Sequence, residues 1–582
     1  MPSKIALPSS TDFPRPTPLR TDRSFKERSV LFWGETGLVF CFLKILFGHP
    51  DPLVGDLTGN RESILRLHDE ARAMGASLLV VPEMAITGYA PRDLLLRDGF
   101  VAAAEASLAQ LASVTLDGPP ILVGTPRAVP GPRGLRNAVA LLRKGVIESF
   151  HDKWLLPGYD VFDEDRWFDS GEEVLHFDLE GKAVAVLCCE DLWHGADAGV
   201  SGYVRDPLSK VDAELIVSVS ASPFVIGKAR AQQDRLRQVA QQTNATVVVL
   251  NQFGAHDELL FDGRVMVAEP NGSLTRLNAG WQAGMTALDW GSLESHSEPD
   301  PLDELVHALA CGISGYVRKT GHESVVLGLS GGLDSALVAT LAAIALGPEA
   351  VHGICMPSRY SSSGSLDDAR DLAARLGMVH LHEIGIEPIH EALRQSLQPA
   401  LGEVAGVTDE NLQARARGVL VMGLANAQGL LPLATGNKSE LAVGYSTLYG
   451  DMCGALLPLG DVFKSKCYEL AVHINRHPQR FGFDEPPLPE STITKPPSAE
   501  LRPDQQDADS LPTYDRLDRV LEAWIEQGVA EDVLPEPDLV GEILPMVQRS
   551  EFKRRQAPVV LKVSPKAFGP GRHIPVVART RD

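Results

Sequence analysis

Residues 325–335, VVLGLSGGLDS, have the composition of a phosphate-binding turn. A β-branched apolar run leads into a Gly-rich turn, and a helical stretch follows in which Ser335 is expected at the N-cap. Backbone N–H groups of such a turn, aided by the helix dipole, favour an anion. This is not a Walker A loop, because Asp334 stands where that loop has Lys. An acid there predicts Mg²⁺ between Asp334 and a nucleotide phosphate, unless the segment is an ordinary turn with Asp334 as a solvated cap.

A second candidate site contains a cysteine that is placed to react. Cys188 and Cys189 end an apolar run, and the acidic stretch EDLW follows at once. We expect Cys188 to be a buried small hydrophobe and Cys189, at the strand's exit, to be a nucleophile. A thiol nucleophile needs a base and a counter-charge, which Glu83 and Lys153 could supply. The alternative for each of these two charges is a solvated surface position.

Two α/β units are predicted to position these residues. Residues 43–288 alternate apolar strand-like runs with helical or loop segments, and a polar, proline-bearing stretch at 289–301 is typical of a linker. A second α/β set follows at 302–582. Residues 1–42 are expected to be a flexible extension leading into the first strand. The expected strands are at 78–81, 121–124, 184–189, 215–220, 247–251, 325–330, 351–357 and 430–435.

Composition narrows the class of protein. The 582 residues carry a formal charge of −22, which argues against a broad basic surface for nucleic acid but leaves room for a local basic patch. Seven scattered cysteines give neither a disulfide framework nor a CxxC pattern, so a reducing cytoplasm is expected. The apolar segment 37–48 is too short to span a membrane and contains Lys44.

The stretches PEMAITGY, HDKWLLPGYDVFDEDRWF and CCEDLW, in this order, resemble the nitrilase or carbon–nitrogen hydrolase superfamily over about residues 43–285. The resemblance implies an αββα sandwich that cleaves C–N bonds through a thioester. Its triad would be Glu83 as general base, Lys153 at the oxyanion and Cys189 as nucleophile. In glutamine-hydrolysing members, the positions that bind the substrate or support the site correspond here to Tyr159, Ser222, Lys228 and Glu164.

The second half resembles the ATP pyrophosphatases. GLSGGLDS alone does not choose among GMP synthetase, asparagine synthetase, tRNA-thiolating enzymes and NAD synthetase, but stretches at 355–369, 408–418, 433–454, 495–518 and 551–558 resemble NAD synthetase in matching order. This implies a Rossmann-like parallel-sheet domain. The implied ATP-binding residues are Gly328, Leu329, Ser330, Gly331, Gly332, Leu333, Asp334, Ser335 and Thr435. The implied deamido-NAD⁺-binding residues are Asn411, Glu440, Tyr445, Ser446, Thr447, Leu448 and Lys553, with Mg²⁺ at Asp334 and Glu440; Glu440 could instead be only a polar clamp on the substrate.

Joined, the halves resemble the glutamine-dependent NAD synthetases. The family implies that glutamine, or free ammonia, supplies nitrogen to deamido-NAD⁺ after adenylation by MgATP, in a cytoplasmic homo-oligomer with no nucleic-acid or membrane partner. A tRNA-modifying adenylase would need a basic face, and a scaffold with decayed sites would have lost the triad. The chain departs from the family pattern at 47–52, at Ala255-His256 in place of Gly-Gln, and at 312–315 in place of an Arg-Asp pair.

Overall fold

The structure, a computed structural model, describes residues 43–194, 202–290 and 295–578. The predicted extension at 1–42 and part of the predicted linker, 291–294, lie outside the described residues. Within the described part, no helix is both long and apolar enough to cross a membrane.

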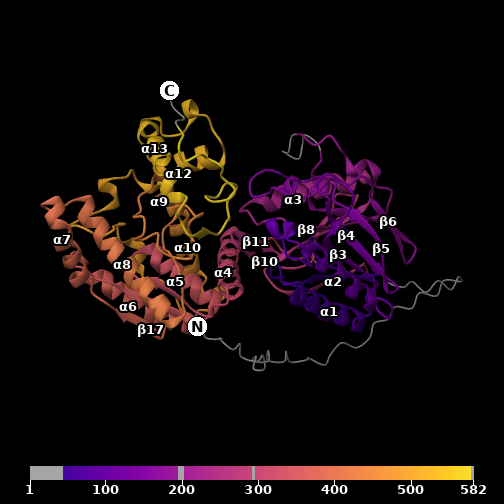
Figure 1. The fold of residues 1–582 in the computed structure, drawn as a ribbon, viewed down its shortest axis with the longest axis horizontal. Helices are drawn as coiled ribbons and strands as arrows, with labels where there is room; N and C mark the ends of the chain where they lie inside the picture. Colours follow the sequence, from indigo (N-terminus) through magenta and orange to yellow (C-terminus); the bar gives the residue numbers. More distant parts are fainter. Residues whose placement is uncertain (1–42, 195–201, 291–294, 579–582) are drawn as a thin grey trace. The chain divides into compact units, whose positions relative to one another are not determined.

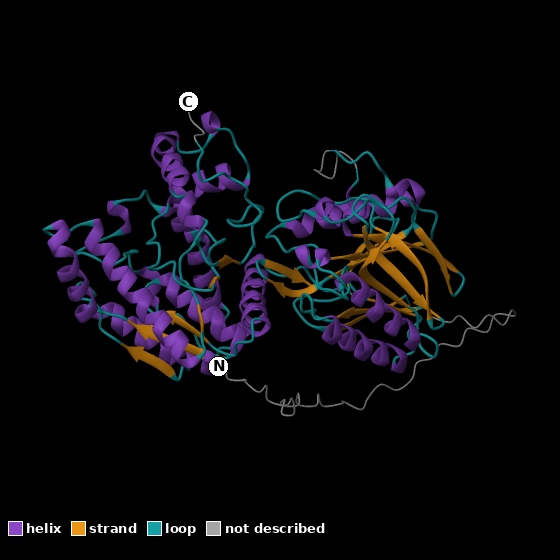
Figure 2. Cartoon of the chain, viewed as in Figure 1, coloured by secondary structure: helices purple, strands orange, loops and turns teal. Residues whose placement is uncertain are grey.

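The first half contains two six-stranded mixed sheets (Figure 2). In the first sheet, parallel strands β1 to β3 are flanked by antiparallel ones, in the order β14-β1-β2-β3-β4-β5. Two helices pack against one face of this sheet through a cluster of buried apolar side chains. The elements are β1 (Lys44–His49), α1 (Leu57–Ala73), β2 (Leu78–Val80), α2 (Phe100–Val114), β3 (Ile121–Ala128), β4 (Leu135–Arg143), β5 (Val146–Asp152) and β14 (Gly284–Asp289).

The second sheet has the order β13-β12-β9-β8-β7-β6, and helix α3 covers its outer face. Alternate side chains of the two sheets, among them Ile45 and Val139 on one and Val186 and Val248 on the other, form one buried core between them. The predicted αββα sandwich is therefore confirmed (Figure 1). The elements are β6 (Leu175–Leu179), β7 (Lys182–Cys188), β8 (Leu215–Ser220), α3 (Lys228–Thr243), β9 (Thr246–Asn251), β12 (Val265–Ala268) and β13 (Leu274–Arg276). A separate ribbon is formed by β10 (Phe253–His256) and β11 (Leu259–Asp262).

The second half is built on a parallel sheet, as predicted, with the order β17-β16-β15-β18. Parallel pairing brings the carboxyl ends of β15 and β18 to one edge of the sheet, where the Gly-rich turn and Thr435 follow. The predicted strand at 430–435 is only two residues long in this sheet. Leu433 still donates its N–H to the Val326 carbonyl of β15 (2.8 Å), and it also forms an isolated bridge with Leu456. The elements are α4 (Pro301–Lys319), β15 (Val325–Gly328), α5 (Leu333–Leu346), β16 (Val351–Cys355), α6 (Ser363–Leu376), β17 (His380–Glu383), α7 (Glu387–Leu401), α8 (Val407–Gln428) and β18 (Leu431–Pro432).

The C-terminal part adds helices beside the carboxyl ends of β15 and β18. Apolar side chains of α9, α12 and α13 form a separate core beside that edge. The elements are α9 (Lys438–Val443), β19 (Leu456–Leu457), α10 (Lys464–Arg476), α11 (Glu490–Thr494), α12 (Tyr514–Leu521), α13 (Pro537–Arg549), α14 (Glu551–Arg554) and β20 (Val559–Val560).

One expected helix boundary is wrong. Helix α5 begins at Leu333 with Gly332 at the N-cap, so Ser335 lies inside the first turn. Its hydroxyl donates to the Gly332 carbonyl (3.0 Å) and accepts from the Ser330 N–H (3.3 Å). Because Gly332 has an extended backbone, the helix starts directly after the turn, and Ser335 fastens the turn to the helix instead of capping it.

Candidate active sites

The predicted triad is assembled by three segments that follow strands. Glu83 follows β2, while Lys153 and Cys189 come directly after β5 and β7. All three side chains are buried: Glu83 and Lys153 are 1% exposed and Cys189 is 8% exposed. The alternative of solvated surface charges is therefore wrong for Glu83 and Lys153.

Lys153 lies between two carboxylates. Its Nζ donates to Glu83 Oε1 (2.8 Å) and to Glu164 Oε1 (2.7 Å). Glu83 is held at both oxygens, because Asn137 Nδ2 donates to Oε1 (2.7 Å) and the Ala221 N–H donates to Oε2 (2.8 Å). A lysine ammonium has three N–H donors, so the one that remains is available to a developing oxyanion.

Electrostatics fix the resting protonation states. Burial lowers the pKa of Lys153, but the charges of Glu164 and Glu83 outweigh burial and raise it well above its usual value. Burial raises the pKa of Glu164 to about 7 despite Lys153. Burial, reinforced by the charge of Glu83, raises the pKa of the Cys189 thiol. The thiol is therefore protonated at rest, and it needs a base to become a nucleophile.

Asp191, a residue whose role the sequence did not reveal, joins the cysteine loop to the lysine loop. Cys189 has a positive φ of 47°, and it is the first residue after β7. Asp191 Oδ2 accepts from the Cys188 N–H (3.1 Å) and lies 2.8 Å from His151 Nε2. Its Oδ1 accepts from the backbone N–H groups of residues 154 and 155 (2.9 and 3.0 Å). These bonds hold the strained nucleophile position against the segment that carries Lys153.

The predicted glutamine-binding residues lie in two groups beside Cys189. Tyr159 donates its hydroxyl to Glu190 (3.1 Å to Oε2), and Tyr203 donates to the same carboxylate (3.0 Å). Lys228 donates to Ser222 Oγ (2.9 Å). Burial raises the pKa of Glu190 and lowers that of Lys228, and the charges of Cys189 and Glu190 partly offset the effect at Lys228. Glu190, which the sequence analysis did not single out, thus places a buried acid beside the nucleophile.

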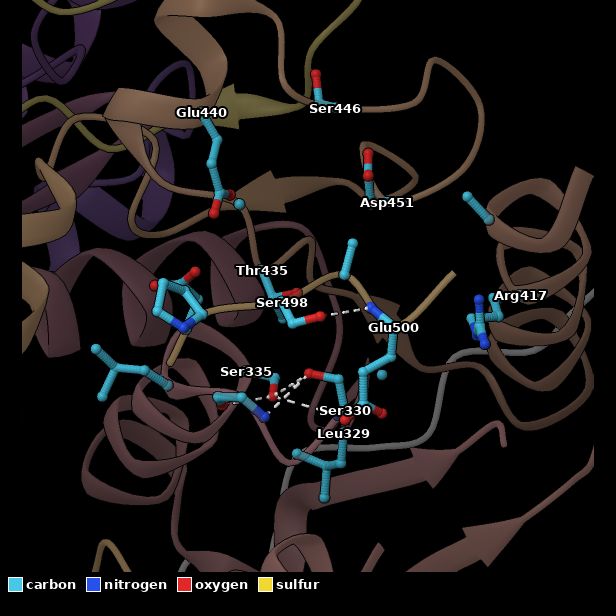
Figure 3. A pocket seen from close by; sticks show the side chains of 18 of the residues that line it. Leu329, Ser330, Ser335, Arg417, Thr435, Glu440, Ser446, Asp451, Ser498 and Glu500 are labelled. Carbon is cyan, nitrogen blue, oxygen red and sulfur yellow. Dashed lines mark hydrogen bonds between the residues drawn. The ribbon is translucent and has the colours of Figure 1, made fainter. Parts of the chain in front are cut away.

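A cavity of about 320 Å³ lies at the edge of the parallel sheet (Figure 3). Most of the residues predicted to bind ATP or deamido-NAD⁺ line this cavity. Those that line it are Gly328, Leu329, Ser330, Gly332, Leu333, Asp334, Ser335, Thr435, Glu440, Tyr445 and Ser446. The predicted residues Gly331, Asn411, Thr447, Leu448 and Lys553 are not among its lining.

Gly331 shapes the turn without lining the cavity. It has a φ of 75°, and a Cβ there would lie 2.2 Å from the carbonyl oxygen of Ser365. Only glycine therefore lets the turn approach α6 this closely. Figure 3 shows Ser330 and Ser335 joined by hydrogen bonds across the turn, with a hydroxyl–hydroxyl distance of 3.1 Å.

Asp334 and Glu440 are brought to one lysine. Lys464, from α10, pairs with Asp334 Oδ2 and lies 3.6 Å from Glu440 Oε1. Asn437 Nδ2 also donates to Asp334 Oδ2 (3.1 Å), whereas Asp334 Oδ1 is buried and has no hydrogen-bond partner among the residues that the structure describes. Burial raises the pKa of Glu440 to about 8, with Lys464 opposing and Asp334 adding to the rise.

Lys464 balances part of the negative charge at the predicted metal site. The expectation of Mg²⁺ treated the charge of Asp334 as unbalanced, but Lys464 supplies a positive charge that the sequence did not reveal. The orphan oxygen of Asp334, with Glu440 nearby, still fits Mg²⁺, which binds through one or two carboxylates together with phosphate oxygens and water.

The predicted deamido-NAD⁺ residues outside the cavity lining support the loop after α9. Lys553 Nζ donates to the carbonyls of Gly444 and Ser446 (2.7 Å each). Thr447 donates its hydroxyl to Asn411 Oδ1 (2.7 Å). Lys553 is therefore docked against this loop through its side chain.

Residues 495–501 close one side of the cavity. Glu500 Oε1 accepts from the Ser362 hydroxyl (3.0 Å) and from Lys495 Nζ (3.2 Å), and Oε2 accepts from the Ser362 N–H (3.3 Å). Ser362 is the N-cap of α6, so the Glu500 carboxylate occupies the positive end of that helix. In Figure 3 the Ser498 hydroxyl accepts from the Glu500 N–H (3.1 Å), and the Glu500 side chain extends toward the turn at Ser330.

Comparisons with known proteins agree with this geometry. Residues 48–292 match the carbon-nitrogen hydrolase family and residues 305–557 match the NAD synthase family. A glutamine-dependent NAD(+) synthetase from Synechocystis sp. is 40% identical over 90% of this chain and 97% of its own length. One from Acinetobacter baylyi is 37% identical over 92% and 98%.

A solved structure shows the same likeness over most of the chain. The glutamine-dependent NAD+ synthetase from Acinetobacter baumannii, in complex with ADP, has a TM-score of 0.72 and 33% identity, covering 92% of this chain and 98% of its own. A synthetase from Cytophaga hutchinsonii, at 20% identity and a TM-score of 0.77, agrees in fold. The family predicted from the sequence is confirmed: the chain belongs to the glutamine-dependent NAD(+) synthetases.

Proposed function

We propose that Cys189 hydrolyses L-glutamine with Glu83 as its base. The sulfur attacks the side-chain amide carbon while Glu83 takes the thiol proton, and one N–H of Lys153 stabilises the oxyanion. The C–N bond then breaks, and Glu83 returns the proton to the leaving nitrogen, so that ammonia and a thioester are formed. Water, deprotonated by Glu83, cleaves the thioester to glutamate and the free thiol. The placement of Lys153 between Glu83 and Glu164 supports these roles.

Substrate orientation follows from the charges beside the nucleophile. Lys228, with Ser222, is suited to the α-carboxylate of glutamine. Glu190, which accepts from the hydroxyl groups of Tyr159 and Tyr203, is suited to the α-ammonium.

At the second site, the nicotinate carboxylate of deamido-NAD⁺ attacks the α-phosphate of ATP, and pyrophosphate leaves. Ammonia then attacks the adenylated carbonyl, loses a proton and displaces AMP, which gives NAD⁺. The turn at 328–335 and Thr435 bind ATP, and the residues around the loop at 444–448 bind deamido-NAD⁺. Asp334 and Glu440 would hold Mg²⁺, whose charge favours departure of pyrophosphate.

The two reactions are divided between residues 43–288 and residues 302–582, joined by 289–301. We further propose a homo-oligomer that works in the cytoplasm. The six cysteines that the structure describes are free thiols, which suits a reducing compartment.

Glutamine labelled with nitrogen-15 at its side-chain amide tests this function. With ATP and deamido-NAD⁺ present, we expect the label in the carboxamide of NAD⁺ and one AMP and one pyrophosphate for each NAD⁺. Release of ADP and phosphate, or an unlabelled carboxamide when no free ammonium is present, would contradict the proposal.

A further inference from the structure

Lys562 is a buried lysine that reaches from the second half of the chain to the first. Its side chain is 1% exposed, and its Nζ lies 3.0 Å from Asp160 Oδ2. The same Nζ donates to the carbonyl of Ser564 (2.6 Å). Asp160 directly follows Tyr159 and has a positive φ of 54°. The conformation of the Tyr159 loop is thus tied to a charge that the second half supplies.

The backbone around Lys562 also contacts the other glutamine-binding group. The Ile226 N–H donates to the Val563 carbonyl (2.9 Å), and Ile226 lies within the loop at 222–228 that carries Ser222 and Lys228. In addition, the Lys562 N–H donates to the Glu258 carbonyl (2.9 Å). Residues 562–564 are therefore bonded to both loops that carry the proposed glutamine-binding residues.

On its other side, the same segment is fixed to the ATP site. Asp461 Oδ2 accepts from the N–H groups of residues 563 and 564 (2.7 Å each), and Oδ1 lies 2.7 Å from the buried Lys438 Nζ. Lys438 follows Asn437, which donates to Asp334. Polar contacts, linked through the consecutive residues 437 and 438, thus connect the Tyr159 loop with Asp334 in the first turn of α5.

The triad itself does not depend on this segment. The partners described above for Glu83 and Lys153, and those that hold the Cys189 loop, all belong to the first half. A change at Lys562 should therefore alter how glutamine is bound and leave the chemical step in place.

We propose that Lys562 is a positioning residue for glutamine binding, which acts through Asp160 on Tyr159 and is supplied by the synthetase half of the chain. This inference rests on the proposed glutamine-binding roles of Tyr159, Ser222 and Lys228. It means that the first half needs residues 562–564 to complete its substrate site.

The test compares Lys562→Met with Lys562→Arg and with Lys566→Met in the full-length protein. Lys566 is a matched control, because it also faces Asp160 (3.9 Å) but its side chain is 37% exposed. Each variant is assayed for NAD⁺ formation with glutamine and with ammonium chloride. We expect Lys562→Met to raise the glutamine KM by about tenfold with kcat within about twofold. Ammonia-dependent synthesis should be unchanged, Lys562→Arg should recover most of the glutamine affinity, and Lys566→Met should match the parent.

An unchanged glutamine KM in Lys562→Met, or an equal loss with both nitrogen donors, would overturn the inference. If Lys562→Met does not fold, Asp160→Asn replaces it, because the amide keeps a hydrogen-bond acceptor but loses the charge. We expect the same rise in the glutamine KM for this variant. An unchanged glutamine KM would again overturn the inference. The proposed function is tested separately: its failure would appear as a parent protein that does not transfer nitrogen from glutamine at all.

Discussion

Glu164 shares the buried ammonium of Lys153 with Glu83. Burial raises the pKa of Glu164 to about 7, so this side chain is mostly neutral below that pH and mostly charged above it. A hydrogen bond between two charged groups is stronger than one to a neutral group. The charged Glu164 therefore holds Lys153 more firmly in the position from which its remaining N–H can stabilise the oxyanion.

The glutaminase rate should therefore rise with pH through about 7, the value to which burial raises the pKa of Glu164. Glu164→Gln should remove this rise and lower kcat by about 10- to 100-fold. Glutamate release is the proper readout, because ammonia-dependent synthesis also rises with pH as more of the ammonia becomes unprotonated. The exposed Glu172 (74%) provides the control, as Glu172→Gln. A rise near pH 7 that persists in Glu164→Gln would exclude Glu164 as its source.

Asp334→Ala should lower the rate of NAD⁺ formation by about 100-fold or more with either nitrogen donor. The change removes the orphan oxygen proposed for the metal and leaves Lys464 with Glu440 as its carboxylate partner. Cys189 should still react with a glutamine-like electrophile, which shows that the first site is intact. Asp367→Ala, at an exposed residue (71%) of α6, is the control. Near-normal synthesis by Asp334→Ala at saturating MgATP would leave Asp334 as a structural residue.

The sequence could supply the reactive residues but not their partners. Cys189, Glu83 and Lys153 stand in short stretches whose residue types fit the chemistry. Lys464 contacts Asp334 from 130 positions away along the chain, and one sequence carries no signal for such a pairing. Glu190 and Asp191 stood beside the nucleophile, but their roles depend on which loops fold onto them.

The turn between β15 and α5 requires glycine at position 331. We expect Gly331→Ala to raise the ATP KM by about tenfold or more and to lower Tm, because a Cβ would meet the Ser365 carbonyl at 2.2 Å and displace the turn. Gly429, which ends α8, is the control: its φ of 67° is also positive and its backbone is left-handed helical, but nothing in the described part of the chain lies within 4 Å of its Cβ position. Gly429→Ala should therefore cost only backbone strain, about 1 kcal/mol, and leave the ATP KM unchanged. Equal ATP KM values in the two variants would contradict the proposed role of the turn.

Most elements near the sites could be predicted, because apolar runs such as residues 215–220 coincide with strands. The start of α5 could not, since serine is a common N-cap and the extended backbone of Gly332 is invisible in the sequence. The docking of residues 495–501 onto α6 was equally hidden, because it depends on one carboxylate meeting a distant helix end.

At the scale of the whole molecule, the three departures from the family pattern meet at one junction. Lys319, at the end of α4, donates to Asp51 Oδ1 (2.6 Å) and to the Ala255 carbonyl (3.0 Å). Gly315 approaches the same alanine so closely that a Cβ would lie 2.8 Å from the Ala255 Cβ. Small residues at 255 and 315 and the pair of Asp51 with Lys319 therefore fit one another. These positions lie far apart in the sequence, and the fold brings them into contact.

One chain holds two active sites that can be inactivated separately, and Cys189→Ala inactivates only the first. Loss of a covalent nucleophile costs about 10⁴-fold or more in turnover, whereas added ammonia bypasses the first site. NAD⁺ formation is measured with glutamine and with ammonium chloride at mildly alkaline pH for Cys189→Ala and for its neighbour Cys188→Ala. We expect Cys189→Ala to lose synthesis from glutamine and keep synthesis from ammonia, and Cys188→Ala to keep both. Loss of both donors by a folded Cys189→Ala, or loss of glutamine use by Cys188→Ala instead, would contradict the account.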